Sequence, residues 1–505
     1  MTINLSELTS AESVKENQLS ASERRAENRT LIFVAALASV FITAIESTIV
    51  ATAMPTIVGA LGNFELLSWV FTAYLLTQAV TIPIYGRLSD LYGRKPILLL
   101  GIALFLIGSI LCGFAWSMIS LVMFRVVQGF GAGALMPVGR TLIGDVYHGA
   151  DRARMQGYVS GVFVGAAVLG PVVGAFLIAH TIWPMVFWIN LPLGLLAGAI
   201  LIWALRERVE RRRHRIDWGG SLLMALGTCT LMFALAQAAT LEIWMIAGLV
   251  GAAALLLLAF VIYETRVAEP IWPMTLWQDR VVTSGNLVSL ALGATTMGIA
   301  AYLPVYIQAV MGDSALIAGL ALMAMSVGGP VGAVLAGRIM LRASYRTAAT
   351  AGACLYIVGT VMMTALHPQS GPLWAMGSGL LMGFGMGMNN NTYMVAIQSE
   401  NGWSQRGIAT STIIFSRILG QAVGAAAFGG ILNARLSKHL TGSGDLVSRI
   451  MTPELRRSLS ATEMQALFQS FDQALHTIFF ILVVLSVAVM AIGLLLPRGR
   501  GILRS

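Results

Sequence analysis

Residues 86–95 read Gly-Arg-Leu-Ser-Asp-Leu-Tyr-Gly-Arg-Lys and separate two apolar runs, at 67–86 and 97–116. Each run has about 20 residues, the length that a helix needs to cross the hydrocarbon core of a membrane. The connector combines cations and one carboxylate with glycines, which permit a tight turn. This pattern predicts two membrane-spanning helices joined by a short basic connector.

The same alternation of apolar runs and polar connectors continues along the chain. Of its 505 residues, 57% are hydrophobic and 11% are charged, whereas a soluble domain has about 25% charged residues. Alternating strands typical of a barrel are absent, so the spans are expected to be helices. We therefore predict an all-α integral membrane protein with 14 transmembrane helices. The expected spans lie near 31–54, 67–86, 97–116, 119–142, 157–179, 184–205, 218–238, 243–263, 283–310, 315–337, 348–366, 372–397, 408–432 and 475–496.

Basic residues gather at both ends of the chain and in every second connector, while the first six of the other connectors contain none. Lys and Arg in short loops favour the cytoplasmic side. Both tails, 1–30 and 497–505, are therefore predicted to face the cytoplasm, which an even number of spans allows. The long connector 433–474 carries charges of both signs and is interpreted as an external loop with some helix. The alternative is a cytoplasmic loop and a miscounted span.

An internal duplication divides the chain. Leu169 to Ala175 is similar to Leu419 to Ala425, and Gly129 to Gly133 is similar to Gly383 to Gly387, at offsets of about 250 residues. Parallel repeats of six helices are typical of transporters whose binding site lies between the halves. We predict six-helix bundles at 31–205 and 266–496 (the second including the loop 433–474), separated by a basic linker and two inserted helices in 206–265.

The segment 86–95 closely resembles the signature loop of the major facilitator superfamily, and similar segments extend over nearly the whole chain. The resemblance implies a major facilitator fold. It also implies a cytoplasmic gate in which Asp90 and Arg94 latch that side in the outward-open state. The second copy has Leu341 in place of the carboxylate, so this role is confined to the first half. The gate residues are Gly86, Asp90, Gly93, Arg94 and Lys95.

Other segments resemble fourteen-span drug:proton antiporters within that superfamily. Gly165 to Gly174 is similar to the fifth-helix antiporter motif, which is represented here by Gly165, Gly170, Pro171 and Gly174. Ile45 to Pro55 resembles the first-helix motif, with Glu46 where aspartate is more usual. Phe187 to Gly194 and Gln398 to Gly420 are also similar to that family. The resemblance implies a proton-coupled antiporter that exports small lipophilic or cationic organic compounds.

Four ionisable residues lie within the predicted hydrocarbon: Glu46, Arg125, Arg140 and Arg417. A charge at that depth costs roughly 2.5–3.5 kcal/mol on insertion scales, so each is a functional candidate. Glu46 is the acid of this set, and we expect it to gain and lose the coupled proton. The resemblance associates Arg125 with proton transfer. Alternatively, Glu46 pairs with an arginine only to fix the packing of helices.

Polar, aromatic and thioether side chains inside the spans are candidates for a substrate cavity. The aromatic residues could stack on organic cations or anchor helices at the membrane interface. The asparagines could face the cavity or bond to backbone, and methionines could line it or simply pack. The candidates are Trp69, Tyr74, Gln128, Tyr302, Tyr306, Met386, Asn389, Asn390, Asn391 and Arg417.

Several function classes find no support in the sequence. The three cysteines and six histidines show no ligand spacing, so no metal or cofactor is expected. The net charge of +9 resides in connectors, which argues against nucleic acid, and no phosphate-binding loop indicates ATP use. No catalytic cluster indicates an enzyme, although a membrane-embedded lipid-modifying enzyme is the rival from another class. The rival within transport is a dedicated exporter of a metabolite, siderophore or lipid.

The expected partners are small organic substrates, protons and the lipid bilayer. Nothing in the sequence requires a second chain, and we expect a monomer. The expected location is the cell membrane, as a multi-pass protein of a bacterial inner membrane.

Overall fold

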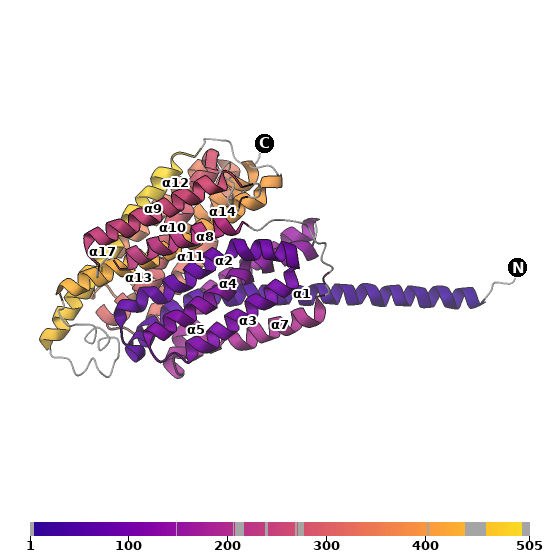
Figure 1. Cartoon of the computed structure of the whole chain (residues 1–505), viewed down its shortest axis with the longest axis horizontal. Coiled ribbons are helices and arrows are strands. Elements are labelled where there is room, and N and C mark those ends of the chain that lie inside the picture. Colours follow the sequence, from indigo (N-terminus) through magenta and orange to yellow (C-terminus); the bar gives the residue numbers. More distant parts are fainter. Residues whose placement is uncertain are drawn as a thin grey trace.

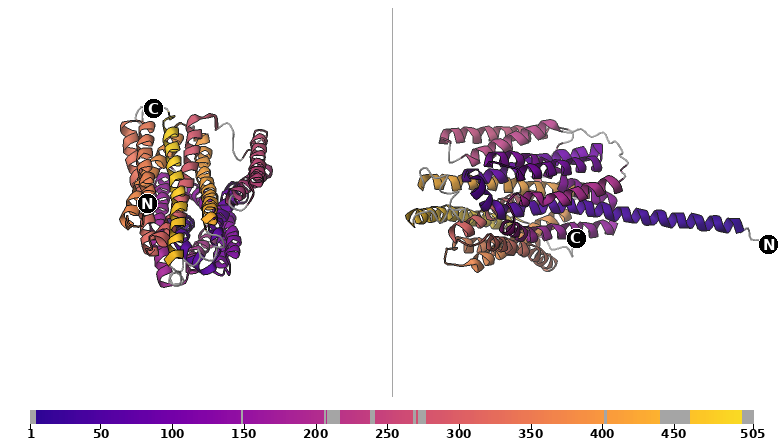
Figure 2. Two further views of the ribbon diagram at one scale, coloured as in Figure 1. Left: turned by 90° about the vertical axis from the view of Figure 1, so that its left-hand side faces the viewer. Right: turned by 90° about the horizontal axis from the view of Figure 1, so that it is seen from below.

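The computed structural model describes residues 5–147, 149–205, 207, 217–237, 241–267, 270, 277–400, 403–439 and 461–496. Every element in these residues is a helix, which confirms the all-α prediction (Figure 1). The helices run side by side along one direction (Figure 2). They are α1 Leu5–Leu61, η1 Phe64–Leu66, α2 Leu67–Tyr92, α3 Arg94–Gly113, α4 Met118–Val146, α5 Gly149–His180, α6 Met185–Trp188, α7 Asn190–Ala204, α8 Trp218–Ala236, α9 Ile243–Glu264, α10 Arg280–Val305, η3 Tyr306–Val310, α11 Ala315–Arg342, α12 Tyr345–Thr364, α13 Pro372–Glu400, α14 Trp403–His439 and α17 Ala461–Gly493.

In the described part of the chain, twelve helices are long and apolar enough to cross a membrane. Helices α5 and α13 lie outside this set but pack among its members, α5 on α1 and α13 on α11 and α12. Three consecutive asparagines in α13 lower its hydropathy. The multi-pass architecture is therefore confirmed, and the total of fourteen spans stays a prediction.

Two predicted connectors are shorter than expected. Helix α2 continues to Tyr92, so the connector to α3 is Gly93 alone, and Gly86 is helical. Gly93 has a φ of 96°, a conformation that a side chain disfavours. On the other side of the bundle, α14 extends to His439 and α17 begins at Ala461, so the predicted loop 433–474 is largely helical where it is described. Residues 440–460 lie outside the described residues.

The helices pack in two groups with matching contacts. Helix α4 packs on α2 and α3 as α13 packs on α11 and α12, and α1 packs on α5 and α7 as α10 packs on α14 and α17. Glycines at equivalent positions permit these contacts: a Cβ on Gly131 would lie 2.6 Å from Phe105 Cα in α3, and one on Gly385 would lie 2.5 Å from Tyr356 N in α12. Small residues let helices approach closely. The duplicated sequence thus corresponds to duplicated packing.

The two groups meet most extensively along two lines, α2 with α14 and α5 with α11, and α1 also contacts α10 between them. We call the side of the bundle that holds Gly93 and Arg342 the basic side, and the side that holds Leu61 the opposite side. On the opposite side, the rings of Phe64 and Phe471 lie 5.5 Å apart, and Asn433 Nδ2 donates to the carbonyl of Glu65 at 2.8 Å. The groups are therefore joined at this side.

Helices α8 and α9 form the inserted pair. They pack on each other, and α8 also packs on α2 and α14. Asp217 caps α8 by accepting a 2.8 Å hydrogen bond from Gly220 N, and Glu264 at the end of α9 is buried beside it, because a Cβ on Gly220 would meet carboxylate oxygens of both. Neither acid was predicted to be buried, because both lie at the ends of their apolar runs. The exact domain boundaries stay predictions.

Candidate functional site

Glu46 lies near the middle of a membrane span. The apolar part of α1 runs from Arg29 to Leu61, which places Glu46 about 25 Å from one end and about 22 Å from the other along the helix. Its side chain is fully buried, with 0% exposure. A carboxylate this deep needs partners, because an isolated charge in an apolar interior is very unfavourable.

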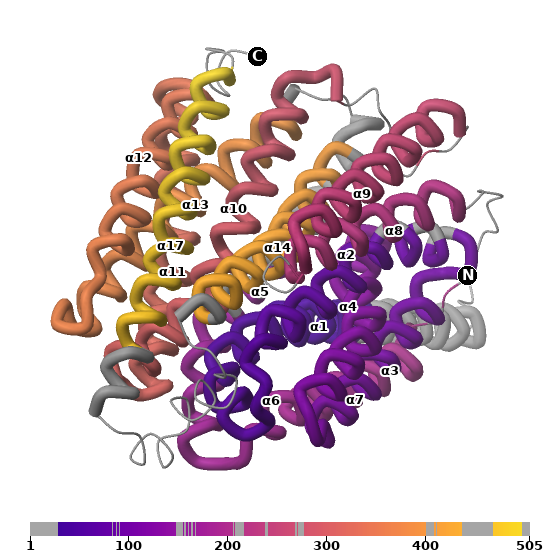
Figure 3. The backbone as a smooth tube through the Cα atoms, turned by 60° about the vertical axis from the view of Figure 1, so that its left-hand side comes forward, coloured from indigo at the N-terminus to yellow at the C-terminus, as the bar shows by residue number. Residues whose placement is uncertain are grey.

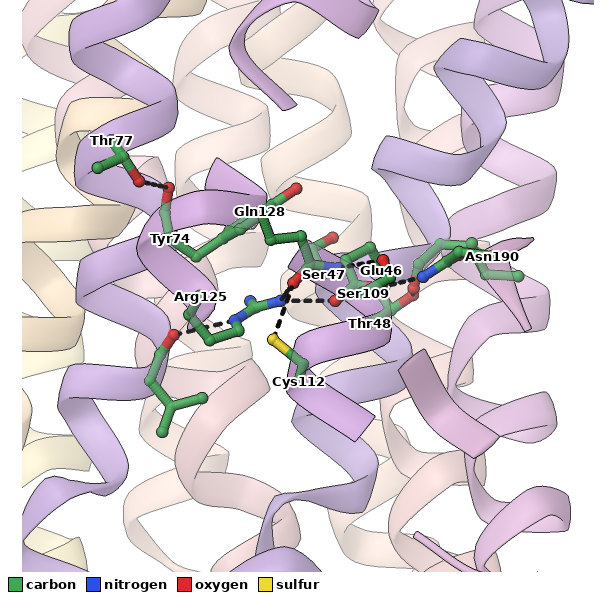
Figure 4. Close-up of polar contacts among 12 residues, drawn as sticks. Glu46, Ser47, Thr48, Tyr74, Thr77, Ser109, Cys112, Arg125, Gln128 and Asn190 are labelled. Carbon is green, nitrogen blue, oxygen red and sulfur yellow. Dashed lines mark hydrogen bonds and ion pairs between the residues drawn. The ribbon is translucent and has the colours of Figure 1, made fainter. Parts of the chain in front are cut away.

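Two side chains from other helices bind the carboxylate (Figure 4). Arg125 in α4 donates from Nη1 to Glu46 Oε1 at 2.5 Å, and Asn190 at the start of α7 donates from Nδ2 to Glu46 Oε2 at 2.5 Å. Each carboxylate oxygen therefore has its own donor. The cluster connects α1, α4 and α7 in the first group.

The guanidinium of Arg125 is held from several directions. Its Nε donates to the carbonyl of Val70 at 3.2 Å, and its Nη1 donates to Gln128 Oε1 at 2.6 Å. The ring of Tyr74 lies 4.1 Å from Arg125 Cζ, which adds a cation–π contact. The planar, multiply bonded guanidinium therefore has a fixed position, which a lysine could not reproduce.

Residues of α3 orient Gln128. Its Nε2 donates to Ser109 Oγ in α3 at 2.8 Å, and Cys112 Sγ lies 3.8 Å from Gln128 Oε1. A Cβ on Gly108 would lie 2.5 Å from Gln128 N, so glycine is needed there for α3 to approach α4. Four helices of the first group (α1, α3, α4 and α7) thus contribute side chains to one connected network around Glu46, and α2 adds the ring of Tyr74.

The network can change charge at one place. Protonating Glu46 would remove the negative member of the ion pair and leave Arg125 with neutral acceptors, Gln128 Oε1 and the Val70 carbonyl. Coulombic interactions are strong in a medium of low dielectric constant, so this change would alter how α1 and α4 attract each other. The geometry agrees with proton exchange, and equally with a pair that serves only packing.

The predicted coupling residues Glu46 and Arg125 lie in one cluster with Gln128 and Tyr74, which were predicted to line the substrate cavity. Asn190 was not predicted as a site residue. The signal was present: Asn190 is a lone amide in an apolar run, and it belongs to the segment Phe187 to Gly194 that resembles fourteen-span antiporters. Ser109 and Cys112 gave no signal, because small polar residues are common in such helices.

The predicted gate residues lie where α2 meets α3, and their described partners belong to the first group. Arg94 donates from Nη1 to Ser89 Oγ at 2.6 Å and from Nε to Asp145 Oδ2 in α4 at 3.1 Å. Gly86 has open space beside its backbone. The side chain of Asp90 lies outside the described residues, so its latch with Arg94 stays a prediction.

Glu207 joins this region to the end of α7. Its two carboxylate oxygens accept from the backbone N–H groups of Arg94 and Lys95 at 2.7 and 2.8 Å. In return, Lys95 Nζ donates to the carbonyls of Ile202 and Leu205 at 2.8 and 2.7 Å. A carboxylate thus caps the N-terminus of α3, and an ammonium caps the C-terminus of α7, which complements both helix dipoles.

We predict that Glu207→Ala lowers the free energy of unfolding by about 0.5–2 kcal/mol, the usual cost of losing a helix cap. Thermal unfolding of the purified protein in detergent measures this. Glu242→Ala, which removes an exposed acid beside the start of α9, is the control and should have a smaller effect. Equal melting temperatures for Glu207→Ala and wild type would contradict the capping role.

The antiporter-type motif in α5 lies at two helix contacts. A Cβ on Gly170 would collide with the side chain of Thr48 in α1, and one on Gly174 would lie 3.0 Å from the carbonyl of Ile49. The carbonyl of Pro171 faces the second group, 2.6 Å from the position of a Cβ on Gly319 in α11. Gly165, by contrast, has open space beside it.

Gly170→Ala should therefore destabilise the protein by about 1–3 kcal/mol, because overpacking forces α5 away from α1. Gly165→Ala, the same change in the same helix, adds a methyl group to open space and should be neutral or slightly stabilising. Melting temperatures of the two purified variants test the contrast. Equal values would mean that α1 and α5 do not pack as described.

The other candidate cavity residues lie apart from one another. The ring of Trp69 packs on Phe233 of α8 at 6.0 Å. Tyr302 is fully buried on the opposite side, with its hydroxyl near Gly429 of α14. Tyr306 places its hydroxyl 2.9 Å from Asp472 Oδ1 and 3.0 Å from the carbonyl of Leu366. These aromatic residues therefore do not form one cluster with Tyr74.

Two of the three asparagines in α13 bond to backbone, which was the alternative to facing a cavity. Asn389 Nδ2 donates to the Gly385 carbonyl in its own helix at 2.9 Å, and Asn391 Nδ2 donates to the Ala333 carbonyl in α11 at 2.8 Å. Both bond to backbone. Asn390 and Met386 are partly buried, and Met386 Sδ accepts from Thr296 Oγ1 at 3.1 Å.

Arg417 in α14 and Arg140 in α4 are also partly exposed, on the basic side of the site described above. A role in substrate binding stays a prediction for these cavity candidates.

Comparison with known proteins agrees with this architecture. Residues 36–425 match the Major Facilitator Superfamily. The chain is 35% identical over 396 residues to Multidrug resistance protein 3 of Bacillus subtilis (strain 168), covering 78% of this chain and 77% of that protein. It is 30% identical over 456 residues to the Multidrug transporter protein MdtP of the same organism, covering 90% and 84%.

A solved structure gives the same arrangement at the level of fold. A bacterial homologue of the human lysosomal transporter Spinster, in an inward-facing and occupied conformation, aligns with 92% of this chain and 96% of its own, with a TM-score of 0.65 and 16% identity. The family match spans most of the chain, from α1 into α14, and includes the Glu46 network. The chain belongs to the Major Facilitator Superfamily.

Proposed function

We propose that this protein is a proton-coupled antiporter that exports small lipophilic or cationic organic compounds by alternating access. The observation that carries the proposal is the fully buried Glu46–Arg125 ion pair in the middle of a membrane span. Ionisable residues at this depth are uncommon and usually functional. In a transporter of this superfamily, such groups can link the uptake or release of a proton to the conformational change that moves cargo.

The class of function has independent support. The chain is an efflux-type membrane transporter rather than an enzyme, given its family and its similarity to proteins named for multidrug resistance and multidrug transport. We extend their cargo to this chain as part of the proposal. We also propose that the basic side faces the cytoplasm, because Lys and Arg favour that side.

Burial of Glu46 determines how coupling would work. Since the carboxylate has no exposed surface in this conformation, a proton or a cargo molecule reaches it only after α1, α4 and α7 shift relative to one another. Protonation is thereby tied to conformation. When Glu46 is neutral, its ion pair with Arg125 is lost and the closed packing of the first group is weakened.

The energetics restrict the cargo. A proton moving down 100 mV releases about 2.3 kcal/mol. If one monovalent cation leaves for each entering proton, no net charge crosses the membrane and the pH difference alone drives export. Of the ionisable residues within the predicted hydrocarbon, Glu46 alone is an acid, so no second embedded carboxylate is available to balance a multiply charged cation. Neutral lipophilic compounds and monovalent cations fit best.

Proteoliposomes with an imposed pH gradient test this proposal. A panel of neutral lipophilic dyes, monovalent lipophilic cations and hydrophilic metabolites should show gradient-driven transport of the first two classes only. Dissipating the gradient with a proton ionophore should stop accumulation. Transport of a single hydrophilic metabolite, or transport that ignores the gradient, would contradict the proposed function.

A further inference from the structure

Three hydroxyls are buried where the first and second groups meet at the opposite side. Ser68 and Thr72 belong to α2 of the first group, and Tyr302 belongs to α10 of the second group. The three residues are 2%, 0% and 0% exposed. Figure 3 shows α14 alongside both α2 and α10. We call Ser68 Oγ, Thr72 Oγ1 and Tyr302 Oη the interface hydroxyls, because they lie at a contact that must separate if the bundle opens at this side.

Two of the interface hydroxyls lie beside Gly429 of α14. A Cβ on Gly429 would lie 2.2 Å from Ser68 Oγ and 3.2 Å from Tyr302 Oη. Glycine therefore lets α14 approach α2 closely at this point. The contact is closed here, and it leaves no space for a cargo molecule between Ser68 and Gly429.

Thr72 lies one helical turn after Ser68, on the same face of α2. At about 100° per residue, Thr72 is rotated by about 40° from Ser68 and by about 20° from Ala79. Ala79 packs in an apolar cluster with Phe415 and Ile418 of α14. Thr72 therefore faces α14 from a position between two contacts with that helix.

None of the interface hydroxyls has a hydrogen-bond partner within the described residues. Thr77 in α2 shows the usual alternative, because its Oγ1 donates to the Ala73 carbonyl of the same helix at 2.6 Å. Burying a polar group without a partner costs free energy, and the group regains this free energy when water reaches it. The closed contact is therefore less stable than apolar side chains of the same shapes would make it.

One acceptor near Ser68 is already bonded to the second group. The Glu65 carbonyl lies three residues before Ser68, and Thr48 in α1 uses a carbonyl at this spacing, since its Oγ1 donates to the Ile45 carbonyl at 3.0 Å. The Glu65 carbonyl instead accepts from Asn433 Nδ2 of α14 at 2.8 Å. Separation of α14 from α2 would release this carbonyl, and Ser68 could then donate to it.

The other line between the groups is closed differently. A Cβ on Gly319 of α11 would lie 2.6 Å from the Pro171 carbonyl of α5 and 3.2 Å from Ala175 Cβ, so backbone and apolar atoms make this contact. Among the described side chains of α5 and α11, no buried hydroxyl lacks a partner. Of these two lines, the unpaired hydroxyls in the described structure therefore occur along α2 and α14.

We propose that the interface hydroxyls weaken the closed contact, so that the two groups part at the opposite side at a reduced cost in free energy. In the closed form each hydroxyl is dehydrated and, within the described residues, unpaired. In the open form each can bond to water. The hydroxyls therefore oppose the aromatic and hydrogen-bonded contacts that join the groups there. The proposal rests on the alternating access of the proposed function and depends on neither its cargo nor its proton.

The distance between the groups at the opposite side reports opening. Glu65 in η1 and Arg435 in α14 are exposed and lie in different groups. Glu65→Cys and Arg435→Cys carry spin labels, and Cys229→Ala and Cys354→Ala remove the exposed native thiols. Pulsed electron paramagnetic resonance in lipid nanodiscs then distinguishes the short distance of the closed form from the long distance of the open form.

Tyr302→Phe and Thr72→Val each remove one interface hydroxyl and keep the shape of the side chain. Each should lower the ratio of open to closed form about tenfold, which corresponds to about 1.4 kcal/mol and lies within the cost of one unpaired buried polar group. The melting temperature should not fall, because the closed form loses an unfavourable interaction. Tyr345→Phe is the matched control: its hydroxyl lies 2.9 Å from Ser399 Oγ within the second group, and its loss should leave the ratio unchanged.

A ratio that is unchanged or raised in either variant would overturn the proposal. A raised ratio with a lower melting temperature would show that buried water bridges the hydroxyls in the closed form. Opening of the wild type that both substitutions leave unaffected would refute this proposal alone and leave the proposed function standing. A single short distance in the wild type, with and without a lipophilic dye, would refute alternating access and this proposal together.

Discussion

Glu46→Gln abolishes accumulation driven by a pH gradient if Glu46 carries the coupled proton. With one proton exchanged per cargo molecule, each pH unit supplies about 1.4 kcal/mol and supports a concentration ratio of about tenfold. The variant should bring the ratio to about one, because glutamine cannot take up or release the proton. Downhill movement of cargo can continue. The measurement is the steady-state dye ratio across proteoliposomes at a fixed pH difference.

The substitution should leave the fold intact, and the structure gives the reason. Glutamine has nearly the shape of glutamate, and its carbonyl can accept from Arg125 as Glu46 Oε1 does. Its amide would face the Asn190 amide, but Asn190 Oδ1 has no hydrogen-bond partner among the described atoms. A flip of Asn190 therefore turns a clash of two donors into a hydrogen bond.

Glu65→Gln provides the matched control, since it makes the same change at an exposed acid in η1, on the opposite side of the bundle. Gradient-driven accumulation should persist there at the wild-type ratio. If Glu46→Gln also accumulates dye normally, the interpretation of Glu46 as a packing residue is correct and the coupling proposal is wrong.

Arg125→Gln should have the largest effect on stability. It leaves the carboxylate of Glu46 buried without its cation, and removing one partner of a buried ion pair typically costs about 3–5 kcal/mol. It also removes the contacts of the guanidinium with Tyr74 and the Val70 carbonyl. Thermal unfolding of the purified protein, followed by tryptophan fluorescence, measures the loss.

The double variant Glu46→Gln/Arg125→Gln separates stability from coupling. With both charges gone, most of the lost stability should return, yet gradient-driven export should remain absent. Arg94→Gln is the control for losing an arginine, because its bond to the half-exposed Asp145 should be worth only about 0.2–1 kcal/mol. A double variant that is less stable than Arg125→Gln would contradict an ion pair as the main interaction.

The sequence predicted the helices well because apolar runs of spanning length have few other structural solutions in lipid. It predicted the duplication for a related reason. Glycines such as Gly131 and Gly385 are needed where two backbones approach closely, so they recur at equivalent contacts. Connector lengths were harder, and Gly93 is an example. The sequence predicts a connector of ten residues at 86–95, and nothing in it indicates that Gly93 alone is enough for the turn between α2 and α3.

The Glu46–Arg125 pair was predictable because embedded charges are rare and must find partners. The rest of the site depends on which way each helix faces. Successive residues on a helix differ by about 100°, so a small rotation decides whether Trp69 points into the bundle or onto Phe233, and whether Asn389 reaches a cavity or its own backbone. Tertiary packing sets that rotation, and one sequence does not reveal it.

In the proposed mechanism Glu46 exchanges a proton for cargo, so the binding of cargo should release a proton. Purified protein in lightly buffered detergent is mixed with a monovalent lipophilic dye, and a pH indicator reports the protons released per dye bound. We expect about one proton for wild type and none for Glu46→Gln, because linkage requires that a cargo favouring the charged state of Glu46 expels the proton. Equal release by both proteins would contradict this mechanism.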